Sequence, residues 1–373
     1  MTHDPLALAQ ELIRFPSLNP PGDEKACIDF LAHLLSRGGL DVHAYEFAEG
    51  RPSLVARIPG MGDLDPLCFT GHVDVVPLGQ EVWSVPPFDG VIAGGRLFGR
   101  GASDMKAGVA AFVAAVLSEA EAGMRFRRGV TLIITAGEET GCEGAFHLGR
   151  LGVLGSAHLL VVAEPSSNRP IVAHKGSMRL VVSASGITAH SSMPDVGDNA
   201  IEKAAEWVCR LSRHAFGSAE HPLLGKTTAA VTTIKGGLNI NSIPDAASFT
   251  VDLRTLPGQS HDALLAQIQE LLGPAAAIAK VTDFGGFSTD PRDPALQPLM
   301  DILAERQGSR PVVRGAPYFT DASALAPALC NVPAVVIGPG EAEQCHRTDE
   351  FCHVERIEEA FDIYRELIRR TCL

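Results

Sequence analysis

The stretch Gly129-Val-Thr-Leu-Ile-Ile-Thr-Ala136, followed by Gly137-Glu-Glu-Thr-Gly141, joins a strongly apolar run to two adjacent acids. A short apolar run rich in β-branched residues and ended by glycine predicts a buried strand. Glu138 and Glu139 then lie at the strand end, where neighbouring carboxylates repel each other and need a counter-charge. Because adjacent side chains in extended chain point in opposite directions, one carboxylate can bind a metal while the other faces a substrate. A solvated loop explains the pair equally well if nothing else in the chain supports a site.

Three further apolar segments also end in residues that can bind a metal. The segment at 66–70 leads to His72 and Asp74, that at 158–163 to Glu164, and that at 332–337 to His346. In open α/β sheets, ligands bind beyond the carboxyl ends of the strands. Four strands that deliver His, Asp or Glu at that end would therefore bring these side chains to one crevice.

Composition and charge narrow the class of protein. The chain has 373 residues, enough for a large core and more in keeping with two domains than one. Its formal net charge of −13 argues against nucleic acid or an anionic membrane as the partner. The 8 cysteines include no CxxC pair, which favours free, mostly buried thiols in a reducing compartment.

The N-terminal residues predict no export. Met1 to Glu11 contain an early acid and no apolar core, which argues against a signal peptide. No apolar stretch approaches the ~20 residues that a transmembrane helix needs. We therefore expect a cytoplasmic protein.

The order of predicted elements divides the chain. Residues 1–175 alternate helices and strands, as in α/β proteins, whereas residues 176–287 give the order β-α-β-β-α-β of a ferredoxin-like unit. From about Asp290 the chain returns to helix, strand and helix, and supplies His346. We expect a three-layer α/β catalytic domain with a mixed sheet, formed by 1–175 and 288–373, with a ferredoxin-like domain inserted at 176–287.

Several candidate ligands have ordinary explanations when taken alone. His72 and Asp74 have the period-two spacing that puts both on one face of a strand, and metal-bound histidine often donates its second ring N–H to a carboxylate. Asp104, in the glycine-rich segment 99–108, suits either a helix N-cap or a carboxylate that bridges two metals. Glu164 and His346 are each ambiguous. Together, two imidazoles and three carboxylates suit Zn²⁺ or a similar ion, not Ca²⁺ or an iron–sulfur cluster.

Four motifs resemble those of the dinuclear-zinc amidohydrolases, a family that includes acetylornithine deacetylase, succinyl-diaminopimelate desuccinylase, aminoacylases and carboxypeptidases. The resemblance runs nearly end to end and in order, and its motifs are Gly71-His-Val-Asp-Val-Val-Pro77, Gly99-Arg-Gly-Ala-Ser-Asp-Met-Lys106, Gly137-Glu-Glu-Thr-Gly141 and Ala163-Glu-Pro165. It implies two Zn²⁺ ions, for which Co²⁺ can substitute. It implies that one metal is held by His72, Asp104 and Glu164, and the other by Asp104, Glu139 and His346.

The resemblance also implies roles around the metals. Glu138 is the expected general base, Asp74 the partner of His72, and the Asp104–Met105 peptide bond is expected to be cis. In the inserted domain, expected to act as a lid and dimerisation domain, His190 would reach across a homodimer to stabilise the oxyanion. Arg254 would bind a substrate carboxylate with Asn241 nearby, although an ion pair with Asp252 also explains Arg254.

The substrate is indicated less sharply. The amino-acid sequences of segments 163–176, 190–192 and 338–350 are similar to those of acetylornithine deacetylase. This resemblance would place the enzyme in arginine biosynthesis. The segment Tyr318-Phe-Thr-Asp-Ala322 departs from that pattern, and Asp321 there could face a basic substrate side chain. Succinyl-diaminopimelate, other N-acyl amino acids and small peptides are the alternatives. A metal-containing binding protein without catalysis is the alternative of another class. A dinucleotide-binding α/β protein also fits the strand pattern, although the glycines at 94–101 do not form its GxGxxG motif.

Overall fold

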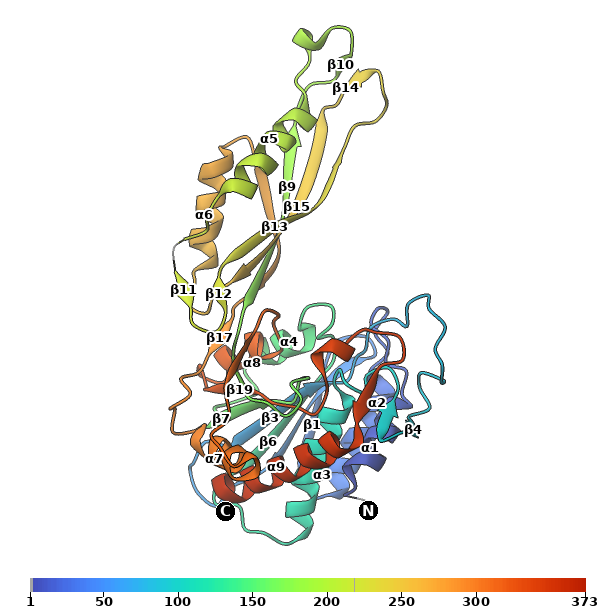
Figure 1. Ribbon diagram of the computed structural model, residues 1–373, viewed down its shortest axis with the longest axis vertical. Helices are drawn as coiled ribbons and strands as arrows, with labels where there is room; N and C mark the ends of the chain where they lie inside the picture. The colour runs from blue at the N-terminus through green and yellow to red at the C-terminus, as the bar shows by residue number, and fades with distance from the viewer. Residues whose placement is uncertain (1–2, 218) are drawn as a thin grey trace. The chain divides into compact units, whose positions relative to one another are not determined.

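The computed structural model describes residues 3–217 and 219–373, and these form two compact units (Figure 1). The first unit contains the chain up to Val172 together with Ser288–Gly315 and Thr320–Leu373. The second unit contains Ala173–Phe287 and Ala316–Phe319.

The segment 316–319 groups with the second unit, although it follows residues 288–315 of the first unit in the chain. The backbone N–H of Lys175 donates to the carbonyl of Ala316, and the rings of Phe284 and Phe319 pack edge-on with centroids 5.0 Å apart. These contacts attach a short piece of the C-terminal segment to the second unit. A pairing between residues so far apart in sequence leaves no local pattern.

A mixed nine-stranded sheet forms the centre of the first unit. Its strands β6, β3, β7 and β19 are neighbours and parallel, so their carboxyl ends share one edge. The order across the sheet is β1 (Asp41–Ala48), β2 (Arg51–Ile58), β6 (Val130–Thr135), β3 (Leu67–His72), β7 (Leu159–Val162), β19 (Ala334–Val336), β8 (Ile171–His174) and β17 (Phe287–Ser288), with β18 (Arg314–Ala316) paired to β8.

Helices cover both faces of this sheet, which gives the predicted three layers. One large buried cluster combines the sheet with α1 (Pro5–Ile13), α2 (Lys25–Arg37), α3 (Lys106–Glu121), α7 (Gln297–Gln307) and α9 (Val354–Cys372). Within it, Phe69 packs between Phe112 and Tyr364, with centroid distances of 5.9 and 5.4 Å. Helices α4 (Glu143–Leu151) and α8 (Ala322–Ala328) pack together on the other face.

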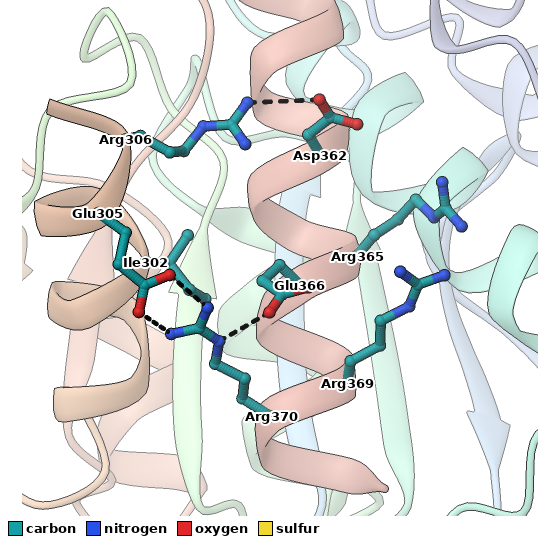
Figure 2. Close-up of a pocket in the computed structure, with 8 residues that line it drawn as sticks. All are labelled: Ile302, Glu305, Arg306, Asp362, Arg365, Glu366, Arg369 and Arg370. Atoms are coloured by element: carbon teal, nitrogen blue, oxygen red, sulfur yellow. Dashed lines mark hydrogen bonds and ion pairs between the residues drawn. The ribbon is translucent and has the colours of Figure 1, made fainter.

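Ion pairs join α7 to α9 at the surface (Figure 2). Arg370 of α9 binds both carboxylate oxygens of Glu305 on α7, at 2.9 and 2.6 Å, and also binds Glu366. Arg306 of α7 lies 3.3 Å from Asp362. These arginines and acids line a surface cleft between the two helices and pair with one another across it.

A small three-stranded sheet lies beside the main one and was not predicted. It consists of β20 (Phe351–His353), β5 (Arg96–Phe98) and β4 (Val91–Ala93), in that order. Phe351 pairs with Phe98 in this sheet. The pairing brings the C-terminal segment that follows His346 next to the segment that leads to Asp104.

The second unit has the predicted ferredoxin-like topology. Its antiparallel sheet has the order β13 (Thr228–Gly236), β15 (Ala246–Thr255), β9 (Gly176–Ser185) and β16 (Ala277–Phe284). Helices α5 (Ala200–Arg213) and α6 (His261–Leu272) contribute Trp207 and Ile268 to its core. Two short strand pairs extend it, β10 (Ala189–His190) with β14 (Ser242–Ile243) and β11 (Glu220–His221) with β12 (Gly225–Lys226).

Two further observations bear on the sequence predictions. No helix in the described part of the chain is both long enough and apolar enough to cross a membrane. All eight cysteines are free thiols, but Cys209 and Cys330 are exposed, so the expected burial does not extend to these two.

Candidate metal and catalytic site

The first unit gathers the predicted ligands at one edge of its sheet. His72 is the last residue of β3, Glu138 and Glu139 follow β6, and Glu164 follows β7. The other two come from loops, Asp104 from the turn before α3 and His346 from the segment between β19 and β20. Parallel neighbours end on the same edge of a sheet, which explains why residues from 72 to 164 meet there.

Asp104 lies between two groups of potential ligands. Its Oδ1 is 3.2 Å from Nε2 of His72, which is itself 3.7 Å from Oε1 of Glu164. Its Oδ2 is 3.5 Å from Nε2 of His346, which is 3.1 Å from Oε2 of Glu139. One oxygen of Asp104 therefore faces each histidine.

The turn that carries Asp104 does not use it as a helix cap. Met105 is the N-cap residue of α3, and no side chain of the described residues caps this helix end. The Asp104–Met105 peptide bond is cis, as expected. The side chain of Asp104 is thus free to contact the two histidines.

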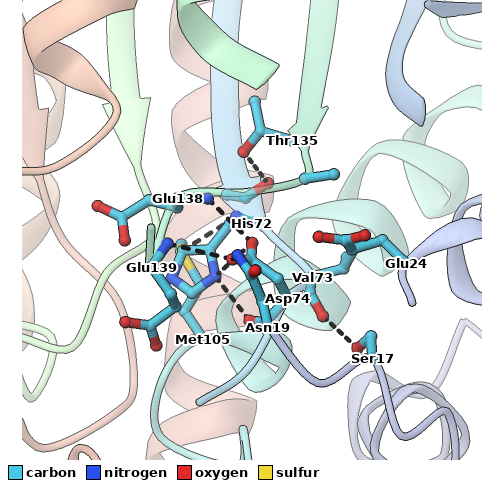
Figure 3. A network of polar contacts seen from close by, with 12 residues as sticks. Ser17, Asn19, Glu24, His72, Val73, Asp74, Met105, Thr135, Glu138 and Glu139 are labelled. Carbon is cyan, nitrogen blue, oxygen red and sulfur yellow. Dashed lines mark hydrogen bonds and ion pairs between the residues drawn. The ribbon is translucent and has the colours of Figure 1, made fainter. Parts of the chain in front are cut away.

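The Asp74 carboxylate lies closer to the turn that contains Glu138 and Glu139 than to the ring of His72 (Figure 3). Nδ1 of His72 lies 2.9 Å from the main-chain oxygen of Asp74 and 3.5 Å from its carboxylate. That carboxylate accepts hydrogen bonds from the backbone N–H groups of Glu138 and Glu139, both at 3.1 Å. With its proton on Nδ1, His72 donates to the Asp74 carbonyl and leaves Nε2 free to bind a metal.

Asn19 completes this network and was not among the site residues predicted from sequence. It is 2% exposed, and its side-chain amide donates to Asp74 Oδ2 and to the Thr140 hydroxyl, both at 2.9 Å. A buried asparagine that donates to a buried carboxylate fixes the direction of that carboxylate. No local pattern around residue 19 signals this contact with residues 74 and 140.

Glu138 is nearly buried beside other acids. It is 8% exposed, and burial raises its pKa well above the ordinary value, with a further contribution from the carboxylates of Glu164 and Glu139. The thiol of Cys142 lies 3.7 Å from its Oε1. Cys142 is itself buried against this carboxylate.

Asp321 is more deeply buried than expected for a residue that contacts substrate at the protein surface. It is 2% exposed, and the Thr135 hydroxyl donates to its carboxylate at 2.5 Å. Together with Glu138 and Cys142 it forms one of three groups, among the described residues, whose potential ligand atoms lie within 4.8 Å of one another. A contact between Asp321 and a basic substrate side chain stays a prediction.

Charge is concentrated in this cluster. Burial would raise the pKa of Asp104, but the imidazoles of His346 and His72 outweigh burial and hold that pKa below its usual range. The same contact, together with Glu139, raises the pKa of His346 to about 10. Burial raises the pKa of Glu164 well above normal, and repulsion from Asp104 adds to the rise. Without a cation, these shifts favour the neutral form of Glu164 and the protonated form of His346, and both reduce the negative charge of the cluster.

The residues fit a pair of metal ions. Oε1 of Glu139 is buried and has no hydrogen-bond partner among the described residues. Imidazole nitrogens and carboxylate oxygens are suitable donors for zinc and similar ions. One ion can be held by His72, Asp104 and Glu164, and a second by Asp104, Glu139 and His346.

Two other buried charged residues near the site were not predicted from sequence to have a role. Arg100 and Glu350 form an ion pair at 2.7 Å between the loops that carry Asp104 and His346. Charged residues in glycine-rich segments and loops are normally expected at the surface. The burial of Arg100 and Glu350 could therefore not be predicted from sequence.

The remaining predicted residues lie in the second unit. His190 is exposed on β10 and pairs with Ser242 of β14, next to Asn241, whose carbonyl accepts from the Ser191 N–H. Arg254 lies on β15, and its Nε is 2.8 Å from Asp252. The structure thus contains the ion pair that was the alternative explanation of Arg254. The roles of all three residues toward a substrate stay predictions.

Comparisons with known proteins identify a family and a shared fold. A family model described as "Peptidase family M20/M25/M40" matches residues 68–370. A succinyl-diaminopimelate desuccinylase of Rhodospirillum centenum is 31% identical, covering 99% of this chain and 98% of its own. A probable succinyl-diaminopimelate desuccinylase of Staphylococcus epidermidis is 29% identical, covering 98% and 97%. The crystal structure of an M20 family metallo-carboxypeptidase from Sulfolobus solfataricus superposes with a TM-score of 0.81 at 17% identity, covering 99% of each chain.

Proposed function

Because the chain belongs to peptidase family M20/M25/M40 and is a metal-dependent hydrolase of amide bonds, we propose that its substrate is a small N-acyl amino acid. The observation that carries the proposed site is the position of Asp104, with one oxygen toward each of two histidine–carboxylate groups. A shared carboxylate is what holds two metals close together in dinuclear hydrolases.

In this proposal the two ions are Zn²⁺, with Co²⁺ able to substitute. His72 and Glu164 hold one, Glu139 and His346 hold the other, and Asp104 contacts both. When bound, such ions polarise the amide carbonyl and lower the pKa of water. They also supply positive charge beside the buried carboxylates.

Glu138 is proposed to move the proton. Its carboxylate takes a proton from the attacking water and returns it to the leaving amine. Burial and the neighbouring acids raise its pKa, which suits a group that must hold a proton between these two steps. Asp74 fixes the main chain of Glu138, so the base has a defined position.

The second unit is proposed to act as a lid and dimerisation domain. In a homodimer, His190 would stabilise the oxyanion across the interface, and Arg254 and Asn241 would contact the substrate carboxylate. The exposed edge strand β13, with Ile234 55% exposed, supports an interface in this unit. We expect Ile234→Lys to shift the mass measured by light scattering from dimer to monomer. Val82→Lys, a change at a 93% exposed residue of the first unit, is the control, and an unchanged mass for Ile234→Lys would refute this interface.

Two substrates stand out. The amino-acid sequence around Glu164 and His346 supports acetylornithine as the substrate. The names of the curated relatives support succinyl-diaminopimelate instead. In the second unit, burial and the nearby Arg254 guanidinium lower the pKa of Lys175. Two neighbouring cations favour an anionic ligand, which supports an acyl group that carries its own carboxylate, as succinyl does.

The test is a panel of substrates with the zinc-loaded protein. Acetylornithine, succinyl-diaminopimelate, acetylcitrulline, acetylmethionine and a dipeptide are incubated with enzyme, and released acid or amine is measured. We expect turnover of at least one acylated amino acid and its loss in Glu138→Gln. Two bound metals without turnover of any compound would instead favour a metal-containing binding protein.

A further inference from the structure

Arg100 and Glu350 form a buried ion pair outside the metal-ligand set. Arg100 is 1% exposed and Glu350 is fully buried. Burying two charges costs solvation, so such a pair is weak evidence of stabilisation by itself. What surrounds the pair is therefore more informative than the pair alone.

The Glu350 carboxylate is saturated by donors from a single turn. Its Oε1 accepts from the backbone N–H groups of Ser103 at 2.8 Å and Asp104 at 3.0 Å. Its Oε2 accepts from the N–H of Gly101 at 3.1 Å and from Nη1 of Arg100 at 2.7 Å. Glu350 thus fixes the backbone of Asp104, the residue between the two histidines.

The strand pairing next to this turn explains how Glu350 reaches it. Glu350 immediately precedes β20, and Gly99 immediately follows β5, its partner strand. The pairing continues past the strand ends, because the N–H of Gly99 donates to the carbonyl of Glu350 at 2.9 Å. The Ser103 hydroxyl also donates to the carbonyl of Phe351 at 2.7 Å.

Arg100 contacts the main chain of two other loops at the site. Its guanidinium donates to the carbonyls of Arg347 at 3.0 Å and His346 at 3.4 Å. It also donates to Pro77 at 3.2 Å, in the loop that continues from His72 and Asp74. Five N–H donors in a planar fork allow one guanidinium to reach all of these acceptors.

We propose that Arg100 and Glu350 are positioning residues that clamp the Asp104 turn to the His346 loop and so set the spacing of these two metal ligands. The inference rests on the proposed metal centre. His72 and Glu164 are held at the ends of β3 and β7, whereas Asp104 and His346 sit on loops. The clamp therefore matters most for the metal position that combines Asp104, Glu139 and His346.

A matched control lies elsewhere in the same unit. Glu119 of α3 is also fully buried, and it accepts hydrogen bonds from Nε of Arg365 at 2.8 Å and of Arg369 at 3.0 Å, both on α9. Among the described residues, Glu119 makes no hydrogen bond to a proposed metal ligand. Glu119→Gln therefore reports the cost of losing a buried charge without the clamp.

The experiment compares zinc-free wild type, Glu350→Gln, Arg100→Lys and Glu119→Gln. Glutamine places an amide N–H₂ where one carboxylate oxygen now accepts two donors, so the turn is released. Lysine keeps the charge and leaves the Glu350 bonds to the turn in place, which gives a milder variant if Glu350→Gln folds poorly. Zinc binding is measured by calorimetry with a competing chelator, and backbone exchange at 99–105 by mass spectrometry.

We expect one of two zinc equivalents to bind about 10–100-fold more weakly in Glu350→Gln, with a smaller loss in Arg100→Lys. Exchange in the 99–105 peptide should accelerate about tenfold or more in zinc-free Glu350→Gln. Wild-type binding of both equivalents by Glu350→Gln, or an equal loss in Glu119→Gln, would overturn the clamp alone. A wild-type protein that takes up no zinc would overturn the proposed function, and the clamp with it.

Discussion

At the scale of single residues, Glu138 and Glu139 are neighbours in sequence with different surroundings. Glu139 contacts His346, whereas Glu138 lies against Cys142 without a histidine contact at hydrogen-bond distance in the described residues. We expect Glu138→Gln to lower kcat by about 10²–10⁴-fold, the usual contribution of a general base, and to keep both metals. Glu139→Gln should lose affinity for one metal. Steady-state kinetics beside metal analysis checks both, and loss of metal in Glu138→Gln would contradict the assigned roles.

Asn19 gives a second residue-scale prediction. Asn19→Ala removes a donor from the buried Asp74 carboxylate, so the free energy of unfolding should fall by about 1.5–3 kcal/mol. The kcat should fall as well, because Asp74 holds the main chain of Glu138. Ser17→Ala is the control, since the buried Ser17 hydroxyl donates to the carbonyl of Val73 rather than to Asp74. An unchanged kcat in Asn19→Ala would show that Asp74 positions the turn without the hydrogen bond from Asn19.

At the scale of elements, long periodic segments could be predicted and short paired ones could not. The apolar runs that became β3, β6 and β7 identify both a strand and the polar residue at its end. Strands such as β5 and β20 have three residues each, too few for a pattern to show. Their pairing depends on contacts between residues about 250 positions apart. Glu350 is an example. Its segment, 338–350, could be singled out from sequence, but its burial depends on the pairing of β20 with β5.

Strand β8 contains a buried histidine, His174, and we expect the free energy of unfolding to depend on pH because of it. Burial lowers the pKa of His174 to about 4 from its ordinary 6.5, so the folded protein keeps this imidazole neutral. The unfolded chain binds a proton near pH 6.5, and stability is therefore present above pH 6.5 and lost as the pH falls toward 4. The loss is about 3 kcal/mol.

Chemical unfolding between pH 4 and 7 measures this effect. His174→Gln should flatten the pH dependence by about that amount, while the exposed His33→Gln serves as a control for removing one imidazole. Equal slopes in wild type and His174→Gln would show that the buried ring does not set the acid limit. The readout is the difference between variants, because other groups also titrate in this range.

At the scale of the whole molecule, all five proposed metal ligands belong to the first unit. The chain has two tryptophans, and each unit contains one, Trp83 in the first and Trp207 in the second. Removing metal should therefore lower the unfolding midpoint reported by Trp83 and leave that reported by Trp207 unchanged. At metal concentrations 100 times Kd the lost stabilisation is about 3 kcal/mol per site.

Single-tryptophan variants make this measurement direct. Trp207→Phe leaves Trp83 as the fluorophore of the first unit, and Trp83→Phe leaves Trp207 in the second. Each is unfolded by denaturant with and without a chelator. Equal shifts of both signals would show that the two units unfold together rather than separately.

The place of β19 in the sheet has a consequence for how the protein is made. This strand lies between β7 and β8, yet it is synthesised after the whole second unit. While the ribosome is still translating residues 288–333, β7 and β8 have no partner between them and present two open edges. Open strand edges recruit other chains, so nascent or prematurely terminated chains should be clients of chaperones and proteases until residues 334–336 emerge.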